Sequence, residues 1–369
     1  MRVLLAAGGS AGHVNPALAI ADKVMEVFPF PESEIMFAGT QKGLESKLVS
    51  RAGYAFSAIK AAGLQRKITP KNIGRNAKAL YYYMTATSAA KKIIQDFNPD
   101  IVVGTGGYVT APVLRTAAKM GLPTVTHESN SLPGITTKML AKTADKVFVS
   151  SGDTLKNLPA EYSAKYTVTG NPLRKDFRRV NDRTAALESL ELTGSMTILS
   201  FGGSLGANKI TEAVIELLKW ESDKDINHIH AYGGNGKEIF NVKPVKNRNI
   251  FAEYIHNMYT CITAADLVIC RAGSMTQTEL KAFGRASIQI PWSGASENHQ
   301  YYNALTMSKA GAAILIDDSE ISGKKLIETV SALYNNRLQI RLMEENAARL
   351  SSPNAASVIV SEMVELLKQ

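Results

Sequence analysis

Cysteine is scarce in this sequence, and the scarcity limits the class of protein. Cys261 and Cys270 are the only two cysteines, and they lack the CxxC spacing of a redox or metal motif. They cannot form the disulfide framework of a small secreted domain, so we expect a protein of the reducing cytoplasm.

Long hydrophobic runs are absent as well. No uncharged apolar run approaches the roughly 18 residues that a membrane-spanning helix needs. The N-terminus has one arginine, a brief apolar stretch and then glycines, a pattern that does not predict a signal peptide. We expect a soluble protein, or one that lies on a membrane rather than in it.

Acidic residues are missing from residues 46–95. The ten basic residues of this window exceed the net charge of the whole chain, which is +9; they are Lys47, Arg51, Lys60, Arg66, Lys67, Lys71, Arg75, Lys78, Lys91 and Lys92. Apolar and aromatic residues lie between them: Leu64, Ile68, Ile73, Leu80, Tyr81, Tyr82, Tyr83 and Met84. This mixture suits an anionic membrane surface. Nucleic acid and an ordinary solvated basic face are also compatible with it.

The sequence does contain a regular alternation of strand-like and helix-like segments. Its 369 residues exceed the size of one hydrophobic core, so two domains are expected. The predicted strands are Val3–Ala7, Ile35–Ala38, Ile101–Val103, Thr124–Thr126, Lys146–Val149, Met196–Phe201, Ile226–Tyr232, Leu267–Cys270, Ser287–Ile290 and Ala313–Ile316. Uniformly apolar strands separated by helices imply parallel sheets covered on both faces. The predicted fold class is α/β, with two Rossmann-like, doubly wound parallel-sheet domains.

The predicted domains are residues 1–172 and 173–352, joined near the segment GNPLR. A C-terminal helix is expected within residues 353–369. It spans Ala355–Leu367 and follows Ser352-Pro353, a good cap and first-turn pair. This helix can pack back on the first domain or on the second.

Each half has a glycine-rich loop after its first strand: GGSAGHVNP at residues 8–16 and GGSLG at residues 202–206. Asn15 is a candidate N-cap and Pro16 a candidate first helical residue, which would direct free backbone amides at an anion. The alternative is a tight turn that needs glycine for its backbone angles alone. The first loop reads GGxxG rather than GxGxxG, and no acidic residue ends the second strand, so an NAD site is disfavoured.

Three more segments follow predicted strands: GTGGY at residues 104–108, HESN at 127–130 and RAGSMTQTE at 271–279. Open α/β sheets place their ligands at this edge. Thr276 and Glu279 have the spacing of a capping box, so Glu279 either closes its own helix or accepts the hydroxyls of a ribose. The spacing alone favours the cap.

No metal site is expected. Asp223 and Asp225 have the carboxylate spacing of a metal-dependent transferase, but they lie in a charged stretch beside Glu221 that reads as a solvated turn. His228 and His230 share one face of a strand without an apparent third ligand.

Six motifs, in order, resemble those of the MurG family, the UDP-N-acetylglucosamine (UDP-GlcNAc) transferases of bacterial cell-wall synthesis. They are GGSAGHVNPALAIA, GTGGYVTAPVLRTAAKMGLPTVTHESNSLPG, TGNPLR, SFGGSLGA, CRAGSMTQTEL and ENHQYYNAL. The resemblance implies a GT-B fold, with the sugar nucleotide in a cleft between two facing domains. It also implies UDP-GlcNAc as donor, lipid I (undecaprenyl-pyrophosphoryl-MurNAc-pentapeptide) as acceptor, and lipid II formed by inversion at the anomeric carbon.

The resemblance further implies a peripheral protein on the cytoplasmic face of the bacterial plasma membrane. Cell-wall synthesis proteins are candidate partners, and no nucleic acid, cofactor or metal is expected. Helix N-termini and Arg174 would then carry the diphosphate charge. Two rival functions are another GT-B transferase with a lipid acceptor, such as a diacylglycerol glycosyltransferase, and a catalytically silent nucleotide-sugar-binding module.

By the same resemblance, several residues match donor contacts of the family. They are Ser10, Ala11 and Gly12 (where the commoner TGG is SAG), Asn130, Arg174, Ser204, Ile255 (whose backbone meets uracil), Ser274, Met275, Thr276, Gln277, Thr278, Glu279 and Gln300. This match raises the ribose role of Glu279 above the cap, although both can hold together. His299 stands where the family usually has a second glutamine beside Gln300.

His13 matches the family histidine that faces the reaction centre, and imidazole suits deprotonation of a hydroxyl. Glu128 and His127 are alternative bases, and a purely loop-shaping role for His13 is the other reading. The resemblance also favours the membrane for the basic window. The residues assigned to the membrane or acceptor are Gly104, Gly106, Gly107, Tyr108, Arg66, Lys67, Ile68, Lys71, Ile73, Arg75 and Leu80.

Overall fold

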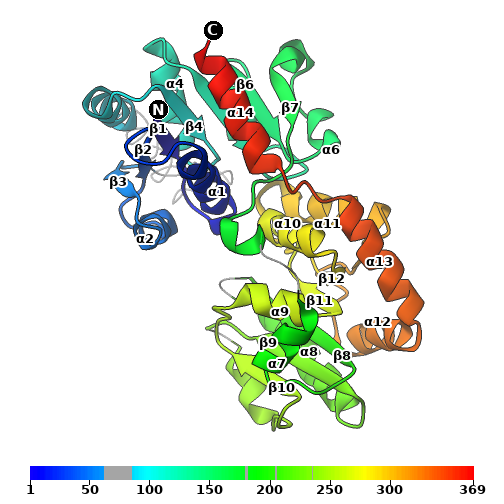
Figure 1. The fold of residues 1–369 in the computed structure, drawn as a ribbon. Coiled ribbons are helices and arrows are strands. Elements are labelled where there is room, and N and C mark those ends of the chain that lie inside the picture. The colour runs from blue at the N-terminus through cyan, green and yellow to red at the C-terminus, as the bar shows by residue number, and fades with distance from the viewer. Residues whose placement is uncertain (62–84, 179–181, 204–205, 235) are drawn as a thin grey trace, which may run out of the picture. The chain divides into compact units, whose positions relative to one another are not determined.

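The computed structural model describes residues 1–61, 85–178, 182–203, 206–234 and 236–369. These residues form two compact units (Figure 1). Unit 1 comprises Met1–Lys175 and Ser352–Gln369, and unit 2 comprises Asp176–Ser351. The chain therefore crosses between the units twice, after Lys175 and before Ser352.

Unit 1 is built on a seven-stranded parallel sheet. In spatial order its strands are β3 (Ala55–Ala58), β2 (Glu34–Gly39), β1 (Arg2–Ala6), β4 (Ile101–Gly104), β5 (Thr124–Glu128), β6 (Lys146–Val149) and β7 (Tyr166–Val168). The strand order reverses direction between β1 and β4. The loops that follow these two strands therefore flank the switch point, where doubly wound sheets bind ligands.

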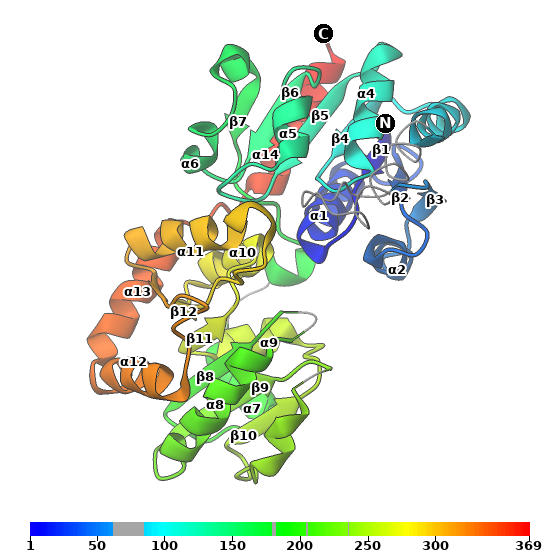
Figure 2. The same cartoon turned by 180° about the vertical axis from the view of Figure 1, so that it is seen from behind.

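Both faces of this sheet are covered because successive side chains of β1 point to opposite faces. Val3 and Leu5 pack with α1 (Ala11–Val27) and α14 (Ala355–Leu367). Leu4 and Ala6 pack with the helical residues 85–97 and with α4 (Thr110–Lys119). Figure 2 shows α4 and α5 on the face opposite α14. The shorter helices are α2 (Leu44–Arg51), α5 (Ile135–Leu140), α6 (Gly152–Leu155) and a 3₁₀ helix at Ala160–Lys165.

The last helix has the predicted bounds and packs on unit 1. Ile359, Val360 and Met363 of α14 are buried in the same core cluster as α1. A 3.0 Å ion pair between Lys146 and Glu362 adds a polar link to β6.

Unit 2 repeats the plan with a six-stranded parallel sheet. In spatial order its strands are β10 (Asn249–Ala252), β9 (Ile226–Ala231), β8 (Met196–Phe201), β11 (Leu267–Cys270), β12 (Ala286–Gln289) and β13 (Ala313–Leu315). The switch point lies between β8 and β11. The predicted class of two doubly wound parallel sheets is confirmed.

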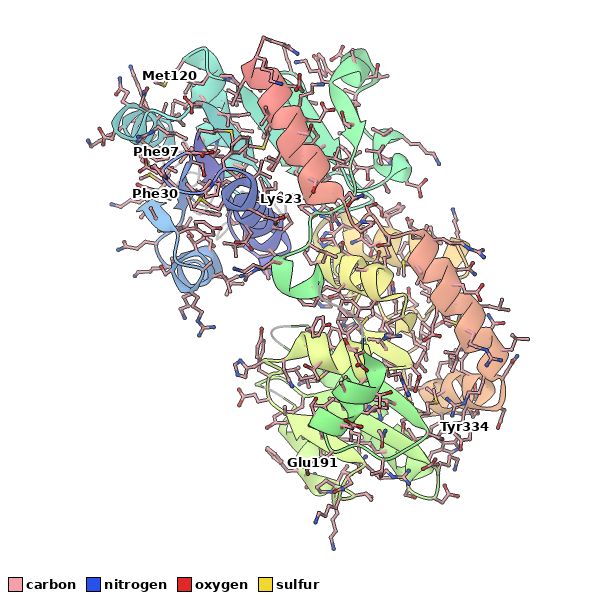
Figure 3. The ribbon with its side chains drawn as sticks, in the orientation of Figure 1. Lys23, Phe30, Phe97, Met120, Glu191 and Tyr334 are labelled. Atoms are coloured by element: carbon pink, nitrogen blue, oxygen red, sulfur yellow. The ribbon has the colours of Figure 1, made fainter. Side chains whose placement is uncertain are left out.

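The helices of unit 2 cover both faces of its sheet. Met196 and Ile198 pack with α8 (Asn208–Glu221) and α12 (Gly323–Asn335). Leu199 packs on the other face with α9 (Met258–Ala264). Tyr334 of α12, labelled in Figure 3, packs edge-on against Trp220 of α8, with ring centroids 6.0 Å apart. The remaining helices are α7 (Arg183–Ser189), α10 (Ser274–Phe283), α11 (His299–Lys309), α13 (Arg337–Arg349) and 3₁₀ turns at Lys175–Arg178, Lys237–Asn241 and Ser296–Asn298.

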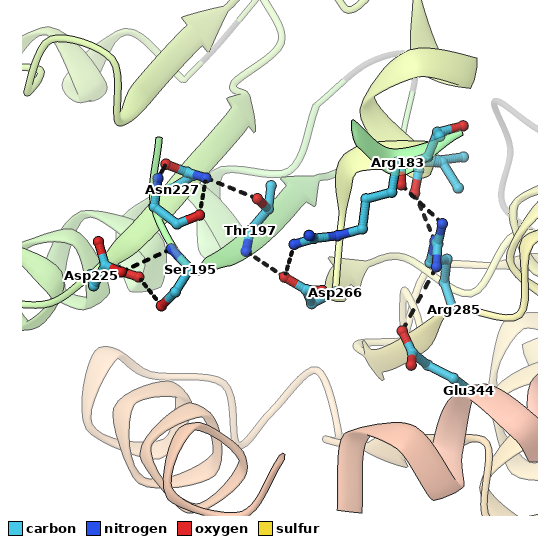
Figure 4. Close-up of polar contacts among 11 residues, drawn as sticks. Arg183, Ser195, Thr197, Asp225, Asn227, Asp266, Arg285 and Glu344 are labelled. Atoms are coloured by element: carbon cyan, nitrogen blue, oxygen red, sulfur yellow. Dashed lines mark hydrogen bonds and ion pairs between the residues drawn. The ribbon is translucent and has the colours of Figure 1, made fainter. Parts of the chain in front are cut away.

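Polar side chains close the amino edge of the second sheet (Figure 4). One Asp266 carboxylate oxygen accepts hydrogen bonds from the Thr197 amide and the Arg183 guanidinium, both at 2.7 Å. Asn227 bonds to Gly194 and Thr197 beside them. These contacts satisfy backbone groups at the strand starts and leave the carboxyl edge to the glycine-rich loops.

Candidate active site

The first glycine loop leads into α1 earlier than predicted. The helix begins at Ala11 with Ser10 at the N-cap position, not at Asn15, because the Ser10 carbonyl already accepts the amides of His13 and Val14. Pro16 therefore lies inside the helix, where it cannot donate to the Gly12 carbonyl. Ser129 Oγ lies 3.4 Å from that carbonyl and donates to it instead.

His13 is held in one orientation by the loop. Its Nδ1 lies 2.9 Å from the Gly8 carbonyl oxygen and 3.3 Å from Ser10 Oγ. A carbonyl only accepts, so Nδ1 carries the proton and donates to Gly8. In the neutral ring Nε2 is then the unprotonated nitrogen and can accept a proton. Thr105 Oγ1 donates to the His13 carbonyl at 2.7 Å and ties this turn to β4.

The β4 loop lies directly against the His13 ring. A Cβ at Gly106, whose φ is +109°, would lie 2.5 Å from His13 Cδ2 and 3.0 Å from Nε2. A Cβ at Gly107 would lie 2.1 Å from the Gly8 carbonyl oxygen. The loop needs glycine at both places because neighbouring atoms occupy the space. Gly104 ends β4, and Tyr108 is exposed at the rim of the loop.

A buried glutamate that the sequence reasoning missed supports the same loop. Glu45 of α2 accepts the Gly9 amide at 3.2 Å and the Thr40 amide at 2.9 Å. It is almost fully buried. Its sequence context, an acidic residue in the first turn of a helix, gives no hint of this contact.

Glu128, at the end of β5, is committed to structural hydrogen bonds. Oε1 accepts the backbone and side-chain amides of Asn130, both at 3.0 Å. Oε2 accepts the Gly134 amide at 2.9 Å and Thr137 Oγ1 at 2.6 Å. The carboxylate thus orients Asn130 and anchors α5. Because each carboxylate oxygen accepts two hydrogen bonds, the geometry favours this role over that of a base.

His127 is buried and points at the chain crossing of unit 1. Its Nε2 donates to the Gly170 carbonyl at 3.1 Å, and burial lowers its pKa. A Cβ at Gly170, whose φ is +79°, would lie 2.2 Å from the Cβ of Ser352. His127 therefore connects β5 to the crossing segment and has no exposed surface on which to meet a substrate hydroxyl.

Arg174 lies in unit 1 and faces an acidic partner there. Its Nε is 3.9 Å from Asp22 Oδ2, and both atoms are buried without a hydrogen-bond partner within the described part of the chain. Tyr54 donates to the other Asp22 oxygen at 2.7 Å. In this arrangement the charge of Arg174 is directed at α1.

The second glycine loop precedes α8 and requires glycine at two places. A Cβ at Gly202 would lie 2.2 Å from the Ala207 nitrogen, and one at Gly206 would lie 2.8 Å from the Tyr232 carbonyl oxygen. Helix α8 begins at Asn208 with no side-chain cap. The Ile210 and Thr211 amides donate to the Ala207 carbonyl, and the two amides before them have no acceptor among the described residues. Ser204 lies outside the described residues.

The segment after β11 forms α10, and the capping-box expectation is wrong. Gly273 occupies the N-cap position, so Thr276 is already inside the helix. Thr276 and Glu279 lie one turn apart, both half-buried. Burial raises the pKa of Glu279 to about 8. Its carboxylate has no protein hydrogen bond among the described residues, which makes it a candidate acceptor for a ligand.

The other residues of α10 divide between the core and the helix surface. Gln277 faces inward, where its amide donates to Gln289 at 2.7 Å and Gln289 donates to Ser287 at 3.1 Å. Met275 and Ser274 are buried, and Thr278 Oγ1 donates to the Ser274 carbonyl. The side chain of Gln277 is therefore used within the protein.

Two more predicted donor contacts lie in unit 2, one in a loop and one in a helix. Ile255 follows β10 and is buried in the core with Cys261, so only its backbone is suited to a ligand. Gln300, in the first turn of α11, accepts the Trp292 amide at 2.9 Å. That bond engages its Oε1 and orients the side-chain amide. His299 is half-buried beside it.

The histidines of β9 form a buried chain of hydrogen bonds. Glu221 binds His228 Nδ1 at 2.8 Å, and Ser200 Oγ lies 2.7 Å from both His228 Nε2 and His230 Nδ1. Thr211 of α8 completes the chain at 3.1 Å from His230. Burial and the neighbouring His228 lower the pKa of His230 to about 3. These hydrogen bonds join α8 to the sheet.

The described part of the chain bears on three other predictions. Within it, no cluster of three or more His, Cys, Asp or Glu residues could hold a metal ion. No helix of those residues is long and apolar enough to cross a membrane. Seven membrane or acceptor candidates lie outside the described residues: Arg66, Lys67, Ile68, Lys71, Ile73, Arg75 and Leu80.

The family models that match the two sheet-containing units define the class of protein, a glycosyltransferase. Models of the glycosyltransferase family 28 N-terminal and C-terminal domains match residues 3–149 and 197–359. The chain is similar to the crystal structure of Acinetobacter baumannii MurG, with a TM-score of 0.76 and 26% identity over 99% of both chains. A UDP-GlcNAc 2-epimerase from Neisseria meningitidis shares the fold, with a TM-score of 0.68 and 15% identity over 99% of this chain and 100% of that one.

A relative in Desulforamulus reducens is 39% identical over 378 residues, which cover 100% of this chain and 99% of that protein. It is named UDP-N-acetylglucosamine–N-acetylmuramyl-(pentapeptide) pyrophosphoryl-undecaprenol N-acetylglucosamine transferase. The chain belongs to the MurG family of N-acetylglucosamine transferases.

Proposed function

We propose that this protein moves GlcNAc from UDP-GlcNAc to lipid I and thereby makes lipid II and UDP. Family membership gives the reaction, and one contact carries its chemistry: the bond from His13 Nδ1–H to the Gly8 carbonyl. It leaves Nε2 as the unprotonated nitrogen of a neutral imidazole. Such a group is suited to accept the proton of an attacking hydroxyl.

In the proposed step, the hydroxyl oxygen of the acceptor MurNAc attacks the anomeric carbon of the donor. The bond from that carbon to the diphosphate oxygen breaks, and UDP leaves with the electron pair. Attack opposite the leaving group inverts the anomeric centre and gives a β-1,4 linkage. The hydroxyl proton passes to His13 Nε2.

We assign donor binding to the carboxyl edge of unit 2. The Glu279 carboxylate accepts the ribose hydroxyls, the backbone at Ile255 meets uracil, and the Gln300 amide reads the sugar. The diphosphate lies at the first amides of α8, where partial positive charge from the helix dipole favours an anion. We further propose that these groups make a divalent cation unnecessary.

We assign acceptor docking to unit 1, on the membrane side. Ile135 and Met139 of α5 are exposed one helical turn apart, and Lys138 and Lys142 lie beside them. Apolar side chains flanked by lysines suit an anionic leaflet, where each nearby Lys or Arg contributes about 1 kcal/mol. The basic window of residues 46–95 adds charge of the same sign. We therefore propose a peripheral location on the cytoplasmic face of the plasma membrane.

An acceptor panel tests this function. The protein is incubated with UDP-GlcNAc and a short-chain lipid I analogue, diacylglycerol or no acceptor, each with and without EDTA. We expect transfer to the lipid I analogue alone, with an unchanged rate in EDTA. Transfer to diacylglycerol would favour the other lipid glycosyltransferase, and loss of transfer in EDTA would overturn the metal-free mechanism.

A further inference from the structure

Asp318 joins four separate segments at the carboxyl edge of unit 2. It follows β13 and is 5% exposed. Its Oδ1 accepts Arg271 Nη1 at 2.5 Å, and its Oδ2 accepts Ser293 Oγ at 2.8 Å and Lys209 Nζ at 3.3 Å. The same lysine donates to the Asp318 carbonyl at 2.8 Å. One residue thus receives four hydrogen bonds from three other segments.

Each of those segments leads directly into a part of the proposed donor site. Arg271 is the first residue after β11 and precedes α10, which carries Glu279. Ser293 follows Trp292, whose amide holds Gln300 at 2.9 Å. Lys209 is in the first turn of α8, immediately after the second glycine loop. A shift of the Asp318 side chain would therefore displace three donor-contact segments at once.

The electrostatics of the cluster favour a fixed arrangement. Burial alone would raise the pKa of Asp318, but the hydrogen bonds from Arg271 and Ser293 outweigh it and hold the pKa below its ordinary value. The side chain of Arg271 is only 11% exposed, and it also donates to the Ile290 carbonyl at 3.1 Å. A buried guanidinium that loses its carboxylate is strongly disfavoured, so it would turn or draw in water.

We propose that Asp318 is a positioning residue for nucleotide-sugar binding. Through Arg271, Ser293 and Lys209 it sets the spacing of the segments that carry Glu279, Gln300 and the second glycine loop. It does not itself touch the donor. The identity of the donor as UDP-GlcNAc rests on the proposed function.

Asp317 provides a matched control. It is adjacent in the sequence and carries the same charge, but among the described residues its carboxylate accepts only the amide and hydroxyl of the nearby Ser319, at 2.9 and 2.5 Å. Asp317→Asn therefore removes one acidic charge at almost the same place and leaves the four hydrogen bonds of the cluster intact, although the Asp317 charge also acts on Lys209 and Asp318.

The test compares Asp318→Asn, Asp318→Glu and Asp317→Asn in the full-length protein. Binding of UDP-GlcNAc is measured by calorimetry, and transfer is measured with a lipid I analogue. For Asp318→Asn we expect a roughly tenfold rise in Kd and in the KM for UDP-GlcNAc, the effect of one charge-assisted hydrogen bond. We expect kcat to stay within about twofold and the KM for the acceptor to stay unchanged. Asp318→Glu should recover part of the affinity, and Asp317→Asn should match the wild type.

Several results would overturn the positioning role. They are an unchanged Kd in Asp318→Asn, an equal loss in Asp317→Asn, and a fall in kcat without a change in affinity. If Asp318→Asn does not fold, Ser293→Ala removes a single hydrogen bond of the cluster and should raise the Kd about twofold to threefold; no rise would count against the role. Calorimetry measures donor binding without transfer. A wild-type protein that binds UDP-GlcNAc but does not transfer GlcNAc would refute the proposed function, and the binding data would still test the positioning role of Asp318.

Discussion

The Nδ1 nitrogen of His13, in the first turn of α1, lies 2.9 Å from the carbonyl oxygen of Gly8 in the loop that precedes the helix. This contact decides which ring nitrogen holds the proton. The glycines of the β1 and β4 loops, packed against each other and against the ring, keep the imidazole in that position. The first glycine-rich loop therefore orients the imidazole that we propose as the base, a role different from the dinucleotide binding that such loops often serve.

His13→Ala should lower kcat for transfer by about two to four orders of magnitude, the usual contribution of a general base. The Kd for UDP-GlcNAc should change by less than about twofold, since no donor contact is assigned to the His13 side chain. Both quantities are measurable on the purified variant. A kcat near that of the wild type would remove His13 from the chemistry, whereas weaker donor binding alone would make it a binding residue.

Gly106→Ala tests the contact between the β4 loop and the His13 ring. A Cβ at residue 106 would displace the imidazole, so we expect a kcat loss approaching that of His13→Ala. Gly121→Ala is the matched control, because Gly121 has a similarly positive φ of +78° but no atom within 4 Å of an added Cβ. Both variants share the backbone strain, so equal losses of activity in the two would show that strain alone is responsible.

Donor affinity should depend on pH through Glu279. Its folded pKa of about 8 means that the unliganded carboxyl is mostly protonated at neutral pH. Only the carboxylate accepts both ribose hydroxyls, so the Kd for UDP-GlcNAc should fall by more than about tenfold between pH 6.5 and 8.5. Calorimetry across this range measures it, and Glu279→Gln should bind weakly with a flat profile.

The linked effect on stability has the opposite sign. Because the folded pKa is raised, the folded protein keeps a proton that the unfolded chain loses above its ordinary carboxyl pKa. The free energy of unfolding of the unliganded protein therefore falls as the pH rises from the ordinary carboxyl pKa toward 8, while donor binding strengthens. A wild-type Kd that is flat from pH 6.5 to 8.5 would contradict the ribose role.

Membrane association is testable on the exposed face of α5. Replacing Ile135 and Met139 by serine should lower partition onto anionic vesicles by about tenfold, since two partly exposed apolar side chains can no longer enter the interface. Transfer to a water-soluble acceptor analogue should be unchanged. Leu338 and Leu342 on α13 have the same spacing and similar exposure in unit 2, so their double serine variant is the control. An equal loss of vesicle binding in both double variants, or vesicle binding that does not depend on salt concentration, would refute docking through α5.

The buried strands were predictable from sequence because they are uniformly apolar and bounded by glycine or polar residues. The three strands that were missed, β3, β7 and β10, are edge strands of three or four residues. Their side chains are half-exposed or exposed, so they lack the apolar run that marks a central parallel strand.

The site could be predicted only where a local motif carries it. The position of His13 beside glycines is visible in the sequence, but its proton depends on the Gly8 carbonyl. The start of α1 was wrong because Asn15 and Pro16 have the composition of a helix start while tertiary contacts allow proline inside the helix. The role of Asp318 could not be predicted from the sequence, because its partners Arg271, Ser293 and Lys209 come from distant parts of the chain.

The most direct test of the central claim follows labelled GlcNAc from UDP-GlcNAc into product. The wild-type protein is incubated with a short-chain lipid I analogue, and the release of UDP is measured together with the anomeric configuration of the new bond by NMR. We predict one UDP released for each labelled disaccharide, joined by a β-1,4 linkage. Binding of UDP-GlcNAc without transfer, or transfer with an α linkage, would contradict it.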